Sequence, residues 1–258
     1  MLSWLQQDPG GFLLFMLYRA PAVLLALSAH ELAHGYAALR SGDTTARDLG
    51  RLSLNPLRHL DLVGTISMFL MGIGWAKPVP VNPNNFKHPR RDDLIVSLAG
   101  VSTNFVLFLL ATGLSILLAK ALYTPDALAY FGADYLLNFQ KEGFAIQLYP
   151  QNDAHIQVIL RTPWLIHIQR FLFQLSLVNI GMGLFNLLPI PPLDGFHVVN
   201  NVFFQGKIYM GGKVFRFMHL GLLILLFTTN FVGEWVMKAI YAVQGAILPL
   251  LLRLFGVA

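Results

Sequence analysis

The sequence predicts an all-α integral membrane protein with about five to six transmembrane helices and a re-entrant loop or short β element. Of the 258 residues, 55% are hydrophobic and 12% are charged, and the mean hydropathy is +0.59. A soluble globular domain carries about 25% charged residues. The apolar residues also gather into long uncharged runs, more than a chain of this length could cover with a polar shell. We therefore expect one polytopic membrane domain, residues 1–258.

Five apolar segments are long enough, or nearly long enough, to cross a hydrocarbon core of about 30 Å, which needs about 20 helical residues. The second and third carry no charged residue. The five predicted spans are Gly11–Ala29, Leu94–Ala119, Phe171–Leu193, Phe217–Gly233 and Ala239–Leu252.

A shorter apolar segment, Leu62–Trp75, would be only about 21 Å long as a helix. Lysines and arginines flank it on both sides, which places both flanks in the cytoplasm under the positive-inside rule. We therefore expect a re-entrant element, with a full span as the alternative. The following Lys77–Asn82 alternates prolines with valines, which favours an extended edge strand.

Charge also predicts the orientation. The first span runs inward and brings residues 30–34 near the cytoplasmic side of the membrane, which we expect to be a bacterial inner membrane. The last two spans are expected to run out and back, returning to Arg253. The net charge of +5 fits cytoplasmic loops and contact with the lipid bilayer, with no support for nucleic-acid binding.

A metal-binding pattern, H-E-L-A-H, interrupts the first apolar run at residues 30–34. Side chains four residues apart share a helix face, so His30 and His34 can reach one cation. H-E-x-x-H is typical of zinc hydrolases, in which the glutamate, here Glu31, is the base. The alternative is a polar helix end without function, but ionisable groups at membrane depth are costly and usually functional.

A third protein ligand is needed for a catalytic zinc site. There is no cysteine, so it must be a histidine or a carboxylate. Asp194 is the best candidate, because three prolines break an uncharged helix just before it and Gly195 follows it. His197 is a further metal candidate.

With these motifs the sequence resembles the site-2 proteases, the intramembrane zinc metalloproteases of peptidase family M50, in the compact branch without a PDZ domain. "HELAH" at 30–34 and "NLLPIPPLDG" at 186–195 carry the resemblance, together with "GRLSLNPLRHLDLVGT", "GWAKPVPVNP" and "AGVSTN". It implies one Zn²⁺ per chain held by His30, His34 and Asp194, with Glu31 as general base. Asn186 would steady a substrate carbonyl or oxyanion. Asn104 would contact substrate or backbone, or only form a helix–helix hydrogen bond.

The resemblance also implies an endopeptidase that cuts in or near the transmembrane segment of a single-span membrane protein, pairing it with an edge near Lys77–Asn82. A polytopic metal or ion transporter is one alternative, but it predicts ionisable residues in several helices and internal repeats. A proteolytically silent scaffold is another, against which the intact Glu31 argues. Substrate identity and oligomeric state are left open.

Overall fold

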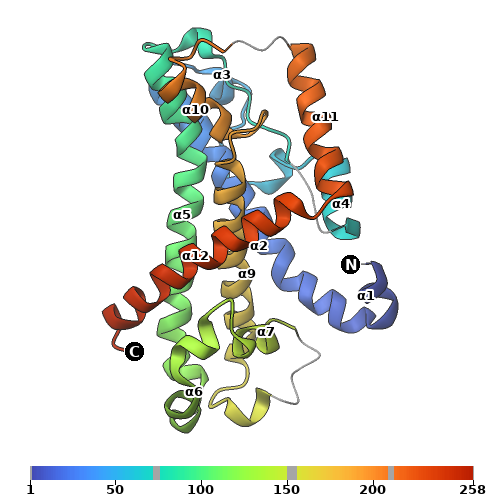
Figure 1. Cartoon of the computed structure of the whole chain (residues 1–258), viewed down its shortest axis with the longest axis vertical. Helices are drawn as coiled ribbons and strands as arrows, with labels where there is room; N and C mark the ends of the chain where they lie inside the picture. Colours follow the sequence, from blue (N-terminus) through green and yellow to red (C-terminus); the bar gives the residue numbers. More distant parts are fainter. Residues whose placement is uncertain (1, 72–75, 150–155, 209–211, 258) are drawn as a thin grey trace. The chain divides into compact units, whose positions relative to one another are not determined.

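The computed structural model describes residues 2–71, 76–149, 156–208 and 212–257, and this part of the chain is helical without a β-sheet (Figure 1). The four longest helices are α2 (Pro9–Ser41), α5 (Pro89–Leu122), α9 (Leu165–Asn186) and α12 (Phe231–Leu254). The shorter ones are α1 (Leu2–Gln7), α3 (Thr45–Asp48), α4 (Leu62–Met71), α6 (Pro125–Leu137), α7 (Glu142–Leu148), α10 (Asp194–Phe203) and α11 (Gly212–Thr228). The predicted all-α class is confirmed.

The four longest helices are also the ones long and apolar enough to cross a membrane, so the chain is an integral membrane protein. They correspond to four of the five predicted spans. The fifth, Phe217–Gly233, covers most of α11 and the first residues of α12, and α11, with 17 described residues, is not among the candidate spans. Five to six spans are therefore not found among the described residues.

The residues group into two compact units, whose borders fall inside the four long helices. Unit 1 comprises Met1–Val23, Leu107–Asn179 and Lys238–Ala258, and unit 2 comprises Leu24–Val106 and Ile180–Met237. The expectation of one domain stays a prediction.

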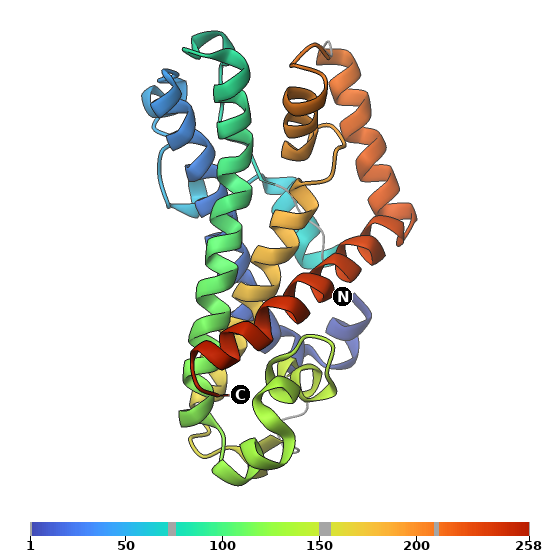
Figure 2. The same ribbon diagram turned by 60° about the vertical axis from the view of Figure 1, so that its left-hand side comes forward.

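Unit 1 holds its helices together with small side chains and buried hydrogen bonds. Ala22, Ala111 and Leu175 form a buried cluster between α2, α5 and α9. The Gln244 amide of α12 donates to Leu137 O (3.1 Å), which ties α12 to the segment that carries α6 and α7 (Figure 2). Small side chains that let helices approach closely, and hydrogen bonds between helices, are both typical of membrane proteins.

Unit 1 also brings the end of α5 next to the end of the last helix. Lys120, in the last turn of α5, and Arg253, in the last turn of α12, line one cavity of about 530 Å³. The C-terminal ends of α5 and α12 therefore lie close together within unit 1. The out-and-back course of the last two predicted spans stays a prediction.

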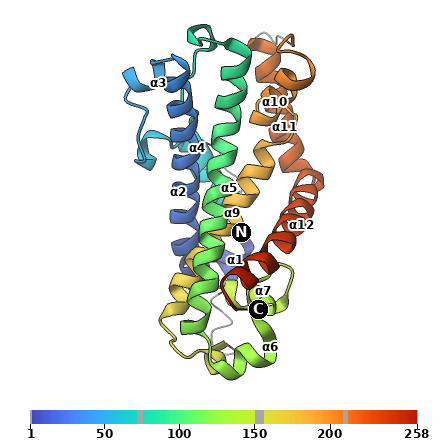
Figure 3. The same ribbon diagram turned by 90° about the vertical axis from the view of Figure 1, so that its left-hand side faces the viewer.

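In unit 2, α2 and α5 lie side by side (Figure 3), with a buried cluster of Ala38, Phe86 and Val96 near their ends. The predicted re-entrant segment begins as α4, whose ten residues span about 15 Å and do not support a full span. Its remaining residues, 72–75, lie outside the described part.

The expected β element is not found among the described residues, apart from an isolated antiparallel bridge between Leu60 and Ala76. Residues 77–82 form no strand. Pro78 and Pro80 have no N–H to offer a ladder. The amides of Lys77, Val79 and Asn82 donate instead to His59 O, to the Glu31 carboxylate and to the Asp43 carboxylate.

Asp43, just after α2, anchors the end of this segment. Its buried carboxylate accepts hydrogen bonds from Asn82 N (2.7 Å), Asn85 Nδ2 (2.8 Å), Thr45 N (3.1 Å) and Thr45 Oγ1 (2.5 Å). Burial raises the pKa of this carboxyl, but the hydrogen bonds outweigh burial and hold the pKa below its usual value. The ionised form is therefore the one that stabilises the fold.

Asp43→Asn is expected to lower the free energy of unfolding by about 2–3 kcal/mol at pH 7, because an amide offers one acceptor to these donors and loses the charge. Since the folded-state pKa is lowered, the contribution of the carboxylate is complete above the unfolded pKa of about 3.9 and is lost as the pH falls through the folded-state value. Unfolding in detergent micelles at pH 7 and about pH 3 should show the difference between wild type and variant shrinking at the lower pH. The exposed Asp126→Asn is the control, and equal stability of wild type and Asp43→Asn at pH 7 would contradict this role.

Candidate metal centre

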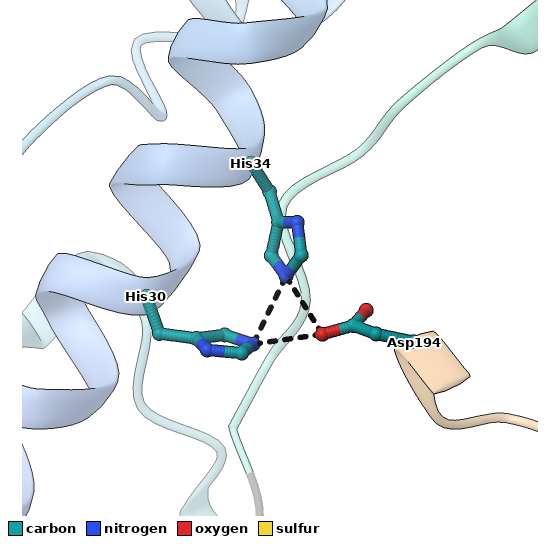
Figure 4. Close-up of side chains that lie close together, drawn as sticks. All are labelled: His30, His34 and Asp194. Atoms are coloured by element: carbon teal, nitrogen blue, oxygen red, sulfur yellow. Dashed lines mark hydrogen bonds and ion pairs between the residues drawn. The ribbon is translucent and has the colours of Figure 1, made fainter. Parts of the chain in front are cut away.

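Three side chains of unit 2 converge on one point (Figure 4). His30 and His34 project from successive turns of α2, and Asp194 is the first residue of α10. Asp194 Oδ2 lies 3.4 Å from His30 Nε2 and 3.3 Å from His34 Nε2, and the two imidazole nitrogens are 2.9 Å apart. The predicted third ligand thus lies with the two histidines.

Hydrogen bonds from α5 orient both imidazoles. His30 Nδ1 lies 2.6 Å from Asn104 Oδ1, and His34 Nδ1 lies 2.7 Å from Val96 O. Both partners are acceptors, so each Nδ1 carries the proton and each Nε2 presents a lone pair to Asp194. A second bond of this kind is what fixes a metal-binding histidine in its tautomer.

The three atoms fit a zinc ion. Ligand atoms about 2.0–2.2 Å from tetrahedral zinc lie about 3.3–3.6 Å from one another, which matches both distances to the carboxylate, whereas the two imidazole nitrogens, at 2.9 Å, lie closer together than that. Asp194 Oδ2 is buried and has no hydrogen-bond partner among the residues that the structure describes, and two imidazole lone pairs face it. A cation at this point satisfies all three groups at once.

The loop between α9 and α10 presents Asp194 because it cannot continue the helix. Pro189, Pro191 and Pro192 break the backbone hydrogen bonding between Asn186 and Asp194. Gly195 is required next, since a Cβ there would meet the backbone of Leu187 and would lie 2.5 Å from Leu188 O. The turn therefore packs directly on the end of α9.

Gly100 of α5 makes room for the imidazoles, a role that the sequence did not reveal. A Cβ at this position would overlap His34 Nε2 and lie 2.6 Å from His30 Cε1. The only signal in the sequence was a glycine within an otherwise apolar span, in the motif "AGVSTN".

Gly100→Ala is expected to lower zinc affinity by about 10–100-fold, the size of effect seen when the support of a metal ligand is lost. The added methyl group must displace at least one imidazole from the position shown. Chelator competition measures the affinity. Gly113→Ala in the same helix is the matched control, because its Cβ meets only the Phe255 ring, at 3.4 Å. Equal zinc affinity in the two variants would contradict this role for Gly100.

Glu31 lies beside the ligands on α2 and is buried, with 8% of its surface exposed. Its Oε2 accepts a hydrogen bond from Val79 N at 2.7 Å. Asn104 is fully buried, its Oδ1 lies 2.6 Å from His30 Nδ1, and its Nδ2 donates to Ala26 O at 3.3 Å, so it makes hydrogen bonds between helices. A contact with substrate stays a prediction.

Two other candidates have hydrogen-bond or ion-pair partners outside the metal-binding group. Asn186 donates to Met182 O in its own helix (3.0 Å), and its role toward substrate stays a prediction. His197 is not in the metal-binding group and pairs with Asp93 at 3.3 Å. That hydrogen bond raises the pKa of His197 more than burial lowers it.

Fold and site together define a helical membrane protein that can hold a catalytic zinc ion with two histidines and an aspartate. The family model "Peptidase family M50" matches residues 18–228. The chain belongs to this family, that of the site-2 proteases, and is a zinc metalloprotease.

Two relatives agree with this assignment. The chain is 36% identical over 187 residues to "Putative zinc metalloprotease YwhC" of Bacillus subtilis, covering 72% of this chain and 69% of the relative. It is 27% identical over 158 residues to "Putative zinc metalloprotease Rip2" of Mycolicibacterium smegmatis, covering 58% and 59%. No solved structure matches the chain.

Proposed function

We propose that the protein is an intramembrane endopeptidase that cuts a single-span membrane protein in or near its transmembrane segment. The observation that carries the proposal is the place of His30 and His34, inside a helix of 33 residues that is long and apolar enough to span a membrane. Ionisable groups at such a place are costly unless they serve a function. The active site would face the cytoplasmic side of a bacterial inner membrane, the side to which the basic loops point.

His30, His34 and Asp194 would hold the zinc ion, which supplies Lewis acidity when bound. Glu31 would take a proton from the attacking water as its oxygen adds to the peptide carbonyl carbon. It would then pass the proton to the leaving nitrogen as the C–N bond breaks. Asn186 would steady the carbonyl oxygen as its negative charge develops.

The geometry also bears on the two alternatives. A transporter needs ionisable sites along a path through several helices, whereas the described residues contain a single His/Asp group able to hold a metal. A silent scaffold needs no base, yet Glu31 lies buried and hydrogen-bonded next to the ligands.

The proposal is tested with purified protein in liposomes and a panel of tagged single-span segments, with soluble casein as the comparison. We expect cleavage of some segments at bonds that mass spectrometry maps in or next to the membrane-spanning sequence. Casein should remain intact. Cleavage of casein with every single-span segment left intact would contradict the proposal.

A further inference from the structure

The Glu31 carboxylate has a backbone partner from the segment Pro78–Pro80. Val79 N donates to Glu31 Oε2 at 2.7 Å, and both residues are buried, with 7% and 8% of their surfaces exposed. A hydrogen bond to a carboxylate is stronger than one between neutral groups, and burial strengthens it further. No hydrogen bond to the other oxygen, Oε1, is present within the described part of the chain, so that oxygen is available to water.

The prolines on either side make this donor specific. Neither Pro78 nor Pro80 has an N–H, so Val79 provides the one amide donor of the triplet. Their fixed φ angles also limit the rotation of the segment. The Val79 N–H therefore points at Glu31 without a competing donor on its neighbours.

Two anchors hold the segment on either side of Val79. On one side Arg51 Nη2 donates to Lys77 O (2.8 Å) and Pro78 O (3.2 Å). On the other side Asn82 N donates to the Asp43 carboxylate (2.7 Å). Lys77 N also donates to His59 O at 2.8 Å. These hydrogen bonds fix the peptide that carries the Val79 N–H from both sides. An incidental contact with Glu31 would need no such support.

We propose that the Val79 backbone amide is the positioning group of the catalytic base: it holds Glu31 Oε2 and leaves Oε1 for the proton transfer. Arg51 keeps that amide in place and is a positioning residue. This inference rests on the proposed role of Glu31 as base. A base held in one orientation needs no reorganisation during the reaction, so the amide contributes to kcat and not to substrate binding.

The first test uses the metal-free protein and no activity. The Val79 amide is followed by NMR in protein labelled with ¹⁵N-valine, in wild type, Glu31→Ala and the exposed control Glu142→Ala. We expect Glu31→Ala to move the Val79 N–H resonance upfield and to speed its hydrogen exchange by at least about 10-fold, the value of one such hydrogen bond. Glu142→Ala should change neither. An unchanged Val79 resonance and exchange rate in Glu31→Ala would overturn the inference.

The second test removes the N–H alone. Val79 is replaced by its α-hydroxy acid, which turns the amide into an ester and keeps the side chain, with the same replacement at Val81 as the control. With the single-span segment that wild type cuts fastest, the ester at 79 should lower kcat by about 10–100-fold, with KM within about threefold of wild type. Zinc content and melting temperature should stay unchanged. The ester at 81 should retain the kcat of wild type.

A side-chain series covers the case in which the ester at 79 does not fold. Arg51→Gln should lower kcat by about 10-fold at full zinc content, and Arg51→Lys should restore part of it, since lysine keeps one donor for the carbonyls. Arg47→Gln removes the same charge from an exposed arginine that is paired only with Asp48 among the described residues, and should have no effect. A merely structural role would lower the melting temperature and zinc content of Arg51→Gln along with kcat.

Failure of the inference and failure of the proposed function give different results. Wild-type kcat in the ester at 79, or in Arg51→Gln where the ester does not fold, overturns the inference alone if Glu31→Gln is inactive. Wild-type cleavage by Glu31→Gln overturns the role of Glu31 as base and this inference with it.

Discussion

Glu31→Gln is expected to lower proteolysis by at least about 1000-fold while zinc stays bound. A positioned general base contributes about 10²–10⁴-fold to a rate, and glutamine cannot accept the proton. Its amide oxygen can still accept the Val79 hydrogen bond, and the three metal ligands are untouched, so the fold and the metal centre should persist. The measurement is the rate of cleavage of a single-span segment in liposomes, with zinc content determined on the same preparation.

The control for this variant is Glu142→Gln, the same change at an exposed position on α7. It should cleave at the rate of wild type. Equal rates for wild type and Glu31→Gln would show that another group takes the proton. A loss of zinc together with activity would show that Glu31 supports the metal centre and does not act only as a base.

Asp194→Ala is expected to lower zinc affinity by more than about 100-fold and to abolish cleavage. Loss of a residue that merely orients a metal ligand costs about 10–100-fold in affinity, so loss of a ligand should cost more. The variant leaves two imidazoles in place and removes the one carboxylate that meets them. Zinc affinity is measured by competition with a chelator of known affinity.

Two further variants refine this test. Asp126→Ala removes an exposed carboxylate from the first turn of α6 and should bind zinc as wild type does. Asp194→Asn keeps the shape of the side chain and one neutral oxygen, and should fall between wild type and Asp194→Ala. Zinc binding by Asp194→Ala with the affinity of wild type would exclude Asp194 as a ligand.

The metal centre was predictable from the sequence because each part of it is local. Histidines four residues apart meet on any α-helix, so His30 and His34 needed no tertiary information. Asp194 was found because prolines break an apolar helix directly before it. A break at membrane depth is costly, since the freed backbone groups need other hydrogen-bond partners.

The surroundings of the metal centre were not predictable, because they depend on contacts between distant segments. The bond from Val79 to Glu31 joins residues 48 positions apart, and no local pattern marks it. The valine–proline alternation predicted a strand, but a strand needs a partner, and the amides of this segment bond to side chains and to His59 O. Gly100 gave no signal of its packing against the imidazoles.

The final helices show the limit of hydropathy as a guide. Phe217–Gly233 and Ala239–Leu252 were predicted as a pair of spans from composition alone. Among the described residues, α12 is long and apolar enough to cross a membrane, whereas α11, with 17 described residues, is not among the candidate spans. Composition identifies apolar segments, but it did not mark the turn near residue 230, where α11 ends and α12 begins.

The most direct test of the central claim is X-ray absorption spectroscopy at the zinc edge on purified Glu31→Gln, which should hold the metal without turning over. The account predicts one zinc ion per chain with nitrogen and oxygen ligands at about 2.0–2.2 Å, including the outer-shell scattering of two imidazoles. Adding the Asp194→Ala substitution to the Glu31→Gln variant should remove the imidazole signal when both proteins receive the same amount of zinc. Absence of the imidazole signal in Glu31→Gln would contradict this metal centre. So would an imidazole signal that stays unchanged when Asp194→Ala is added.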